Sequence, residues 1–293
     1  MRKTVIVWVD GALKPVDAVR ISPLDHGFLY GAAFFETLRT YGGRPFLLAD
    51  HLARLRRGLE AAGIRWRLEE KAIARAVAEV LEANGLADGV VRLTVTAGEG
   101  PPVLTAAPYA KPMTLLFARP LPPALAAWQE RGRPLVTVAL PRNGPEGRER
   151  YKAHSFLNNL LARRELGDRD AEGLMRTADG RVAEGIVSNV FFVRGDELVT
   201  PALTAGILPG VTRRLVLALA PQAGLTPVER DVWPEELAEA DEVFLTNAVQ
   251  ELVPVCAVDG RPVRACPGPR TRRLLARYRE LAHQGLRSVA DIR

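Results

Sequence analysis

The sequence predicts an α/β protein of two domains, and three observations lead to this prediction. Apolar stretches typical of strands alternate with amphipathic stretches of helical spacing along the whole chain. The 293 residues, 47% of them apolar, suffice for one large or two medium domains. Residues 119–133, RPLPPALAAWQERGR, contain three prolines and interrupt the pattern. We therefore predict a domain at 1–120, an interdomain loop at 121–133 and a second domain at 134–293, with the active site expected between the two domains.

The first half of the chain is expected to hold strands and two long helices. A strand at 4–11 and another before Ser22 come first, then a short helix near 31–37. Gly42-Gly43 marks a hairpin within a strand region at 38–48. Asp50 is predicted to cap a helix over 51–63, in which leucines recur at helical spacing up to the stop at Gly63. The remaining predictions are a helix at 71–85 and strands at 90–98 and 111–120.

The second half continues the alternation of strands and helices. Strands are predicted at 134–140, 172–178, 189–194, 197–201, 241–247 and 252–258. Helices are predicted at 155–166, 211–224 and 270–284. Mixed elements in both halves favour two α/β-type domains.

Composition argues against several classes of protein. The net charge is +6, but the arginines are spread among acidic residues without a basic tract, so a nucleic-acid surface is not expected. No apolar run approaches the roughly 18–20 residues that span a bilayer, and the N-terminus is predicted to be a strand rather than a signal peptide. Cys256 and Cys266 form no CxxC and no metal spacing. We expect a cytoplasmic protein with a cavity for anionic small molecules and no metal.

Two residues between 150 and 212 are suited to hold pyridoxal 5'-phosphate (PLP). Lys152, one of only five lysines against thirty-five arginines, precedes an amphipathic helix and could form a Schiff base with a carbonyl cofactor. The alternative is a solvated lysine after a polar loop. Glu184 stands at the end of a short strand, where a carboxylate could keep a pyridine nitrogen protonated. Its alternative is an exposed loop glutamate.

Phosphate-binding elements accompany these two residues. Leu208-Pro209-Gly210-Val211-Thr212 opens a helix, and N–H groups at a helix N-terminus bind phosphate, although an ordinary capped helix has the same spacing. Arg54 could make a bidentate phosphate contact. Ser188 and Asn189 could hydrogen-bond the cofactor or the loop backbone. Among the histidines, His26 is interpreted as a turn residue, His51 as orienting its helix, and His154 as close enough to Lys152 to touch the site.

Taken together, these segments resemble the class IV (fold type IV) PLP enzymes, which include branched-chain aminotransferases, D-amino acid aminotransferases and 4-amino-4-deoxychorismate lyases. The resemblance extends over residues 21–55, the block from Lys152 to Thr212, and residues 241–260. It implies PLP as cofactor, an N-terminal α/β sandwich, a C-terminal pseudobarrel and a homodimer. The residues that match the family's motifs are Lys152 (Schiff-base lysine), Glu184 (pyridine nitrogen), Arg54, Val211 and Thr212 (phosphate), and Tyr30, Phe35 and Arg92 (substrate pocket).

Within this family, the chain is most similar to the aminodeoxychorismate lyases. Asn247-Ala248 follows their pattern, where branched-chain aminotransferases usually carry Gly-Thr for the phosphate. Ala97 stands where D-amino acid aminotransferases carry an arginine for the substrate carboxylate. We therefore expect a lyase that forms p-aminobenzoate for folate synthesis, with Arg92 and Arg142 as candidates to hold the substrate's carboxylates. The alternatives are an aminotransferase acting on branched-chain or D-amino acids, and a PLP-binding protein without catalysis.

Overall fold

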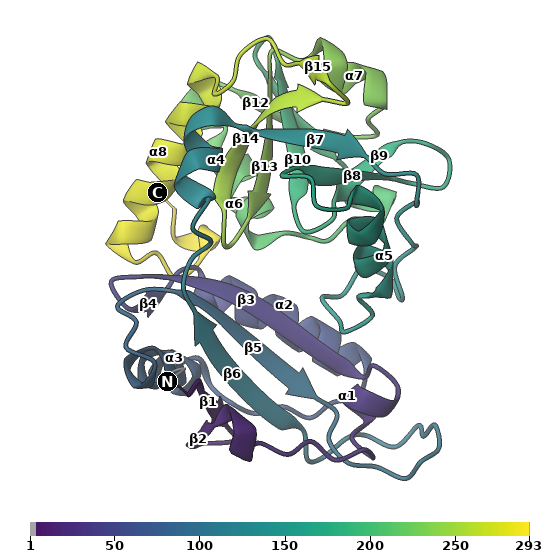
Figure 1. The fold of residues 1–293 in the computed structure, drawn as a ribbon, viewed down its shortest axis with the longest axis vertical. Coiled ribbons are helices and arrows are strands. Elements are labelled where there is room, and N and C mark those ends of the chain that lie inside the picture. Colours follow the sequence, from purple (N-terminus) through teal and green to yellow (C-terminus); the bar gives the residue numbers. More distant parts are fainter. Residues whose placement is uncertain (1–3, 293) are drawn as a thin grey trace. The chain divides into compact units, whose positions relative to one another are not determined.

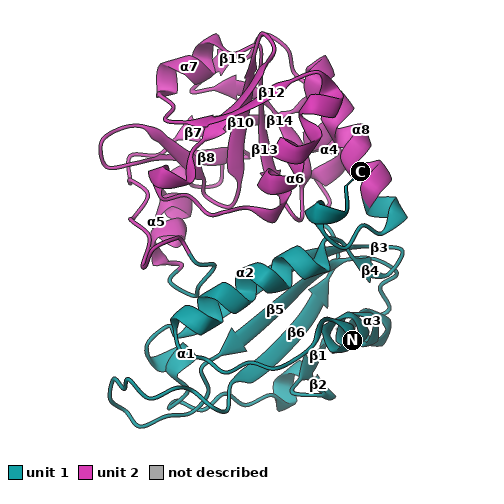
Figure 2. Cartoon of the chain, turned by 180° about the vertical axis from the view of Figure 1, so that it is seen from behind, with its two compact units in different colours: residues 1–121, 151–155, 282–293 teal, residues 122–150, 156–281 magenta. Residues whose placement is uncertain are grey.

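Two β-sheets organise the chain, each in its own compact unit (Figure 1 and Figure 2). The computed structural model describes residues 4–292, so Lys3 lies outside the described part. Unit 1 comprises residues 1–121, 151–155 and 282–293, and unit 2 comprises residues 122–150 and 156–281. Neither unit is one continuous segment, because the chain returns to unit 1 twice after first leaving it.

Unit 1 contains a six-stranded antiparallel sheet in the order β2-β1-β6-β5-β3-β4. Its strands are β1 (Ile6–Val9), β2 (Ala12–Pro15), β3 (Ala33–Tyr41), β4 (Arg44–Pro45), β5 (Val90–Thr96) and β6 (Met113–Arg119). Its helices are α1 (His26–Leu29), α2 (Leu48–Ala61) and α3 (Glu70–Ala83), with 3-10 turns at Val16–Ala18 and Val289–Asp291.

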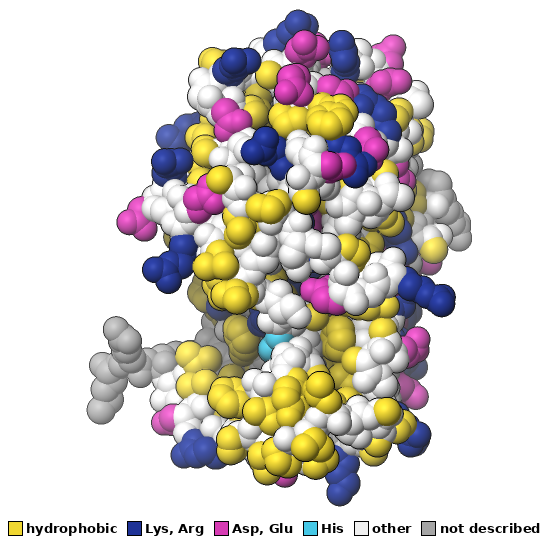
Figure 3. Space-filling view, turned by 90° about the vertical axis from the view of Figure 1, so that its right-hand side faces the viewer, with side chains coloured by type: hydrophobic (Ala, Val, Ile, Leu, Met, Phe, Trp, Pro, Cys, Tyr) yellow, Lys and Arg dark blue, Asp and Glu magenta, His cyan; other side chains and the backbone are white. Residues whose placement is uncertain are grey.

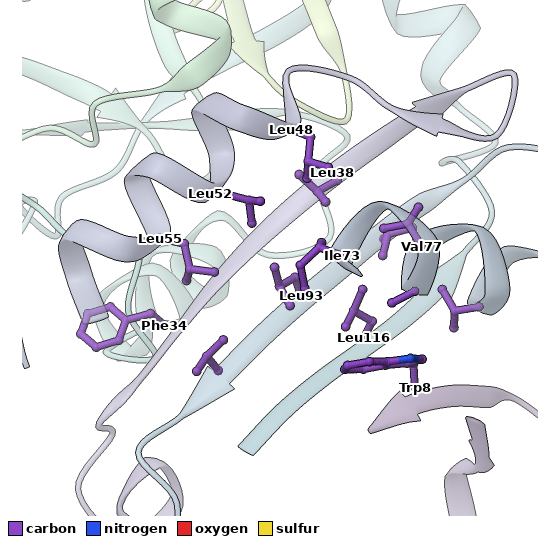
Figure 4. Packing of buried hydrophobic residues seen from close by; sticks show 14 of the residues in the cluster. Trp8, Phe34, Leu38, Leu48, Leu52, Leu55, Ile73, Val77, Leu93 and Leu116 are labelled. Atoms are coloured by element: carbon purple, nitrogen blue, oxygen red, sulfur yellow. The ribbon is translucent and has the colours of Figure 1, made fainter. Parts of the chain in front are cut away.

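The core of unit 1 lies between the sheet and helices α2 and α3. Leucines 48, 52, 55 and 59 of α2 recur at helical spacing and are all buried. Figure 4 shows Leu52 and Leu55 of α2, and Ile73 and Val77 of α3, gathered over the strands that carry Leu93 and Leu116. This layer fixes α2 on the sheet and with it the polar residues that α2 carries.

Two expectations about the first half are wrong. Residues 31–37, predicted as a short helix, form the beginning of β3, and the short helix α1 lies earlier in the chain. Asp50 does not cap α2, because the helix begins at Leu48 after Leu47, which adopts a left-handed conformation with φ of 53°. The Asp50 carboxylate instead accepts hydrogen bonds from the Ser288 hydroxyl at 2.9 Å and the Val289 N–H at 2.7 Å. Asp50 thus holds the C-terminal segment on unit 1.

Unit 2 contains a nine-stranded mixed sheet, in the order β12-β11-β10-β13-β14-β7-β8-β9 with β15 paired to β14. The strands are β7 (Arg133–Thr137), β8 (Glu172–Arg176), β9 (Val182–Gly185), β10 (Asn189–Arg194), β11 (Glu197–Pro201), β12 (Thr226–Arg230), β13 (Glu242–Asn247), β14 (Glu251–Val258) and β15 (Arg261–Pro262). The helices are α4 (Leu125–Arg131), α5 (Leu157–Leu166), α6 (Val211–Leu219), α7 (Pro234–Glu239) and α8 (Pro269–Gln284), with 3-10 turns at Leu203–Ala205 and Pro221–Ala223. Helix α4 lies within the stretch predicted as a loop, and β12 and α7 were not predicted.

The apolar core of unit 2 surrounds its central strands. Val190 and Phe192 of β10, Val243 and Leu245 of β13, and Val255 of β14 are all buried in one cluster. Near-continuous burial along these strands explains why they appear in the sequence as apolar runs rather than strict alternations. No helix within residues 4–292 combines the length and apolar composition that crossing a bilayer requires.

Candidate active site

Lys152 belongs to unit 1 because residues 151–155 run beside the beginning of β3. The Phe35 N–H donates to the Lys152 carbonyl at 2.9 Å, and the His154 N–H donates to the Ala33 carbonyl at 2.9 Å. Phe34 and Ala153 form an isolated antiparallel bridge between these two hydrogen bonds. This short ladder fixes the backbone on both sides of Lys152 and leaves its side chain half-buried.

Phe35 brings two cationic side chains together. The Lys152 Nζ lies 4.6 Å from the centroid of the Phe35 ring, and the Arg92 Cζ lies 3.6 Å from the same centroid. Both distances fall within the range of cation–π attraction. Burial lowers the pKa of Arg92. The structure therefore brings Lys152 and Arg92, two residues predicted for the site, to the ring of a third, Phe35.

His154 joins this group through Arg92. The Arg92 Nη2 donates to the His154 Nε2 at 3.4 Å, and the imidazole lies 5.8 Å from the Phe35 ring centroid. Burial, followed by the charge of Arg92, lowers the pKa of His154 below its usual 6.5. His154 is therefore neutral at pH 7 and accepts from Arg92.

Tyr30, the third residue predicted for the substrate pocket, lies in a different environment. It follows α1, is 40% exposed and packs edge-on against the His26 ring at 4.8 Å. His26 is fully buried and bonds to the Tyr109 hydroxyl and the Pro101 carbonyl, both at 2.8 Å, in keeping with a structural role.

Arg54 points to a buried carboxylate that sequence reasoning missed. Its Nε donates to Glu36 Oε1 at 2.8 Å and its Nη2 donates to Glu36 Oε2 at 2.6 Å, a bidentate pair. The His51 Nδ1 also lies 2.7 Å from Glu36 Oε2. Burial alone would raise the pKa of Glu36, but Arg54 and His51 lower it to about 2. Burial lowers the pKa of His51, so the imidazole is neutral and donates its Nδ1–H.

Glu184 is a buried carboxylate in unit 2, at the end of β9. Its Oε1 accepts from the Arg142 Nε at 3.0 Å, with the Arg150 Nε at 4.0 Å. Its Oε2 accepts from the Asn189 Nδ2 at 3.2 Å and from the Leu208 N–H at 3.0 Å. The two arginines and two neutral donors stabilise a charged carboxylate in this buried position.

Arg142, predicted as a candidate to hold a substrate carboxylate, contacts Glu184 and the beginning of α5. Besides Glu184, it donates to the side-chain oxygens of Asn158 at 3.0 Å and Asn159 at 3.3 Å. The guanidinium is therefore committed to Glu184 and to the beginning of α5. This contact favours a role in holding Glu184 over a role in binding a substrate carboxylate.

The beginning of α6 holds the predicted phosphate-binding turn. Val211 and Thr212 are the first residues of the helix, and both are buried. The first N–H groups of a helix have no acceptor within it, so they are available to an anion. A Cβ on Gly210 would lie 2.0 Å from the Asn189 Oδ1, so only glycine permits this close approach. Asn189 also donates to the Leu208 carbonyl at 3.0 Å and thereby ties the turn to Glu184.

Comparison with known proteins shows the family of this chain. A family model described as amino-transferase class IV matches residues 33–258. The aminodeoxychorismate lyase of Bacillus subtilis is 41% identical over 258 residues, with 87% of each chain covered. The chain belongs to the class IV aminotransferase family. A putative branched-chain-amino-acid aminotransferase of Methanocaldococcus jannaschii is also similar, 32% identical over 94% of this chain and 96% of the relative.

Solved structures of class IV enzymes have the same fold. The branched-chain amino acid aminotransferase of Escherichia coli superposes with a TM-score of 0.87 at 26% identity, covering 97% of this chain and 96% of that one. The predicted fold class, with its second-domain sheet of half-barrel type, is confirmed. Class IV membership likewise confirms that the chain is a PLP-dependent enzyme rather than a passive binding protein.

The described side chains fit this cofactor. Unit 1 supplies the Lys152 amine and the guanidinium of Arg54. Unit 2 supplies the buried Glu184 carboxylate and the beginning of α6, where Gly210 leaves room that a Cβ would fill. An amine, a carboxylate and anion-binding groups are what an aldehyde, a pyridine nitrogen and a phosphate require. Within residues 4–292, no group of three or more His, Cys, Asp or Glu side chains is arranged to hold a metal.

Proposed function

We propose that this protein is a 4-amino-4-deoxychorismate lyase, which splits its substrate into p-aminobenzoate and pyruvate. The observation that carries the proposal is the similarity to the Bacillus subtilis lyase, which exceeds the similarity to the reported aminotransferases while covering most of both chains. Two further features of the sequence support it. Asn247-Ala248 occupies the turn between β13 and β14, and the buried Ala97 supplies no cation for a carboxylate.

Five residues would hold the cofactor under this proposal. Lys152 would bind it covalently, Glu184 would face the ring nitrogen, and Arg54, Val211 and Thr212 would bind the phosphate. When bound, PLP supplies an electron sink that makes the proton on the carbon bearing the substrate's amino group removable. Asn189 would act by holding Glu184 and the α6 turn together, since it bonds to both.

Lys152 would move the proton. Its amine, freed when the substrate amine takes its place, would remove the proton from the ring carbon that bears nitrogen. The leaving group needs one proton on its methylene carbon to become pyruvate. The Lys152 amine can donate the proton that it removed from the ring carbon. Aromatisation of the ring makes the elimination strongly downhill, and the protein's main contributions are therefore orientation and proton transfer.

Arg92 would bind a carboxylate of the substrate. It lies on the same aromatic ring as Lys152, so an anion bound by Arg92 would place its carbon skeleton close to the amine. His154 holds one edge of the guanidinium in place. Phe35 would orient both cations through its ring face.

The second candidate is an aminotransferase acting on branched-chain or D-amino acids. The similarity to the Methanocaldococcus jannaschii and Escherichia coli proteins supports the branched-chain version. In that reaction Lys152 would remove the same kind of proton, but a keto acid would leave and the amino group would stay with the cofactor. The two candidates therefore differ in product rather than in the residue that starts the reaction.

Product analysis separates the two candidates. PLP-loaded protein would be mixed in parallel with aminodeoxychorismate and with single amino acids, and p-aminobenzoate and keto acids would be quantified. The lyase proposal predicts p-aminobenzoate and pyruvate in equal amounts over many turnovers. Keto acid released from leucine or D-alanine, without p-aminobenzoate from aminodeoxychorismate, would make the aminotransferase the correct assignment.

The expected setting follows from this reaction. We propose a cytoplasmic homodimer that acts on small carboxylated substrates, in the supply of p-aminobenzoate for folate, without nucleic-acid or membrane partners. Figure 3 shows hydrophobic side chains gathered at the lower end of one face. Unit 1 exposes apolar side chains, among them Phe28 of α1 at 73% and Leu104 at 82%, which favours burial against a second copy.

A further inference from the structure

The two cysteines of the chain, which are ten positions apart, lie close together in unit 2. Cys256 is in β14, and Cys266 lies between β15 and α8. Both are free thiols and partly exposed. The β14–β15 hairpin brings the segments together, with the Val263 N–H donating to the Cys256 carbonyl at 3.0 Å. The hairpin therefore turns the chain back on itself between Cys256 and Cys266.

Gly132, at the end of α4, shows how close they are. A Cβ on this residue would lie 2.3 Å from the Cys266 Sγ and 3.1 Å from the Cys256 Cβ. The two cysteine atoms are therefore separated by no more than the sum of those distances. The Cys266 Sγ therefore lies near the Cys256 side chain, and rotation about the two Cα–Cβ bonds can bring the sulfur atoms toward each other.

The immediate surroundings keep the Cys266 thiol protonated and offer the two sulfur atoms no metal site within the described residues. The Cys266 Sγ donates to the Arg131 carbonyl at 3.7 Å. Burial, and then the proximity of Cys256, raise the pKa of Cys266 to about 11. No third metal-binding side chain joins the two within the described residues. Two sulfur atoms with no further ligand can form a bond to each other but not a metal site.

We propose that Cys256 and Cys266 form an intrachain disulfide when a peroxide oxidises the protein. The Cys256 thiolate would attack the peroxide O–O bond and become a sulfenic acid, with one water released. The Cys266 sulfur, after losing its proton, would attack that sulfenic sulfur and expel the second water. Two thiols and one hydrogen peroxide thus give one disulfide and two waters, so atoms and electrons balance.

The disulfide would tie β14 to the segment that leads into α8. It would close a loop of about ten residues and remove conformational freedom from the unfolded chain. We expect the oxidised protein to melt roughly 5 °C above the reduced protein. The bond involves no residue assigned to the candidate active site, so the inference stands whatever reaction the enzyme catalyses.

The test uses the full-length holoenzyme, fully reduced and then treated with hydrogen peroxide. Denatured thiol counting, intact mass and peptide mapping would follow the cysteines. The proposal predicts loss of both thiols together, loss of two hydrogen atoms in mass, and one peptide pair linked through Cys256 and Cys266. Stable sulfinic acid on single cysteines, a disulfide between two chains, or unreacted thiols would each overturn it.

Two serine variants provide the control. Cys256→Ser and Cys266→Ser should each fold, because serine is nearly isosteric, and neither should gain thermal stability on peroxide treatment. A matched rise in melting temperature in either variant would show that oxidation acts elsewhere, which contradicts the proposal. Peptide mapping of the wild type remains decisive should one variant fold poorly.

Discussion

Arg54 shares its guanidinium group with Glu36, a fully buried carboxylate on β3. The two parallel hydrogen bonds fix the guanidinium of Arg54 in one orientation. Separating the two groups would leave a buried charge uncompensated, which keeps the pair together. His51, one turn before Arg54, bonds to the same carboxylate. The role of His51 in orienting helix α2, inferred from the sequence, thus acts through Glu36. The phosphate-binding role of Arg54 stays a prediction.

The buried cluster of Glu36, Arg54 and His51 makes the free energy of unfolding depend on pH. Because the pKa of Glu36 is about 2 when folded against an ordinary 4.5, the unfolded chain takes up this proton first. The free energy of unfolding should therefore fall between pH 4.5 and 2, by on the order of 3 kcal/mol from this group. His51, with its lowered pKa, adds a loss that begins below pH 6.5. Urea unfolding at a series of pH values measures both effects.

A matched pair of variants isolates the contribution of Glu36. Glu36→Gln should be less stable at neutral pH and should show a smaller loss between pH 4.5 and 2. Glu60→Gln, on the exposed face of α2, should reproduce the wild-type profile. If Glu36→Gln loses as much free energy of unfolding between pH 4.5 and 2 as the wild type, carboxylates other than Glu36 cause the acid destabilisation.

Arg92 tests the substrate side of the proposal. Arg92→Ala should raise KM for aminodeoxychorismate about 10- to 100-fold, because a charge-assisted hydrogen bond is worth roughly 1.5–3 kcal/mol. Cofactor binding, measured by absorbance titration, should remain near wild type. Arg75→Ala, on the exposed surface of α3, is the matched control. If KM stays unchanged in Arg92→Ala, the carboxylate is bound elsewhere.

At the scale of elements, the beginning of α6 depends on one glycine. A Cβ at Gly210 would overlap the Asn189 Oδ1, and Asn189 holds Glu184. Gly210→Ala should therefore displace the turn, weaken PLP binding at least roughly tenfold and cost about 1–3 kcal/mol of stability. Gly144→Ala, where a Cβ would meet nothing within 4 Å, provides the control. Equal PLP affinity in the two variants would refute this account of the phosphate turn.

Elements with strong periodicity were predictable, and elements without it were not. The leucine spacing of α2 and the apolar runs of β10 and β13 placed these elements close to their observed bounds. Residues 31–37 were misassigned because a short apolar run has no period that separates helix from strand. The sequence does not predict helix α4, because the three prolines that precede it favour an irregular stretch.

At the scale of the whole molecule, contacts between segments that are distant along the chain cannot be predicted from the sequence alone. Motif spacing pointed to Lys152, Glu184 and Arg54, but not to Glu36, whose partners lie 15 and 18 positions away on another element. The approach of Cys256 to Cys266 arises from the β14–β15 hairpin and Gly132, and no cysteine motif announces it. Likewise, residues 151–155 and 282–293 join unit 1 through non-local hydrogen bonds such as Leu47 N–H to the Leu286 carbonyl.

The most direct test of the lyase proposal is p-aminobenzoate formation by PLP-loaded wild type and Lys152→Ala, followed by fluorescence with freshly prepared aminodeoxychorismate. Lys71→Ala, an exposed lysine on α3, is the control for loss of a positive charge. We predict sustained turnover by wild type and Lys71→Ala, and a loss of at least about 1,000-fold in Lys152→Ala. Wild-type protein that binds PLP yet forms no p-aminobenzoate, or Lys152→Ala with near-normal turnover, would contradict the proposal.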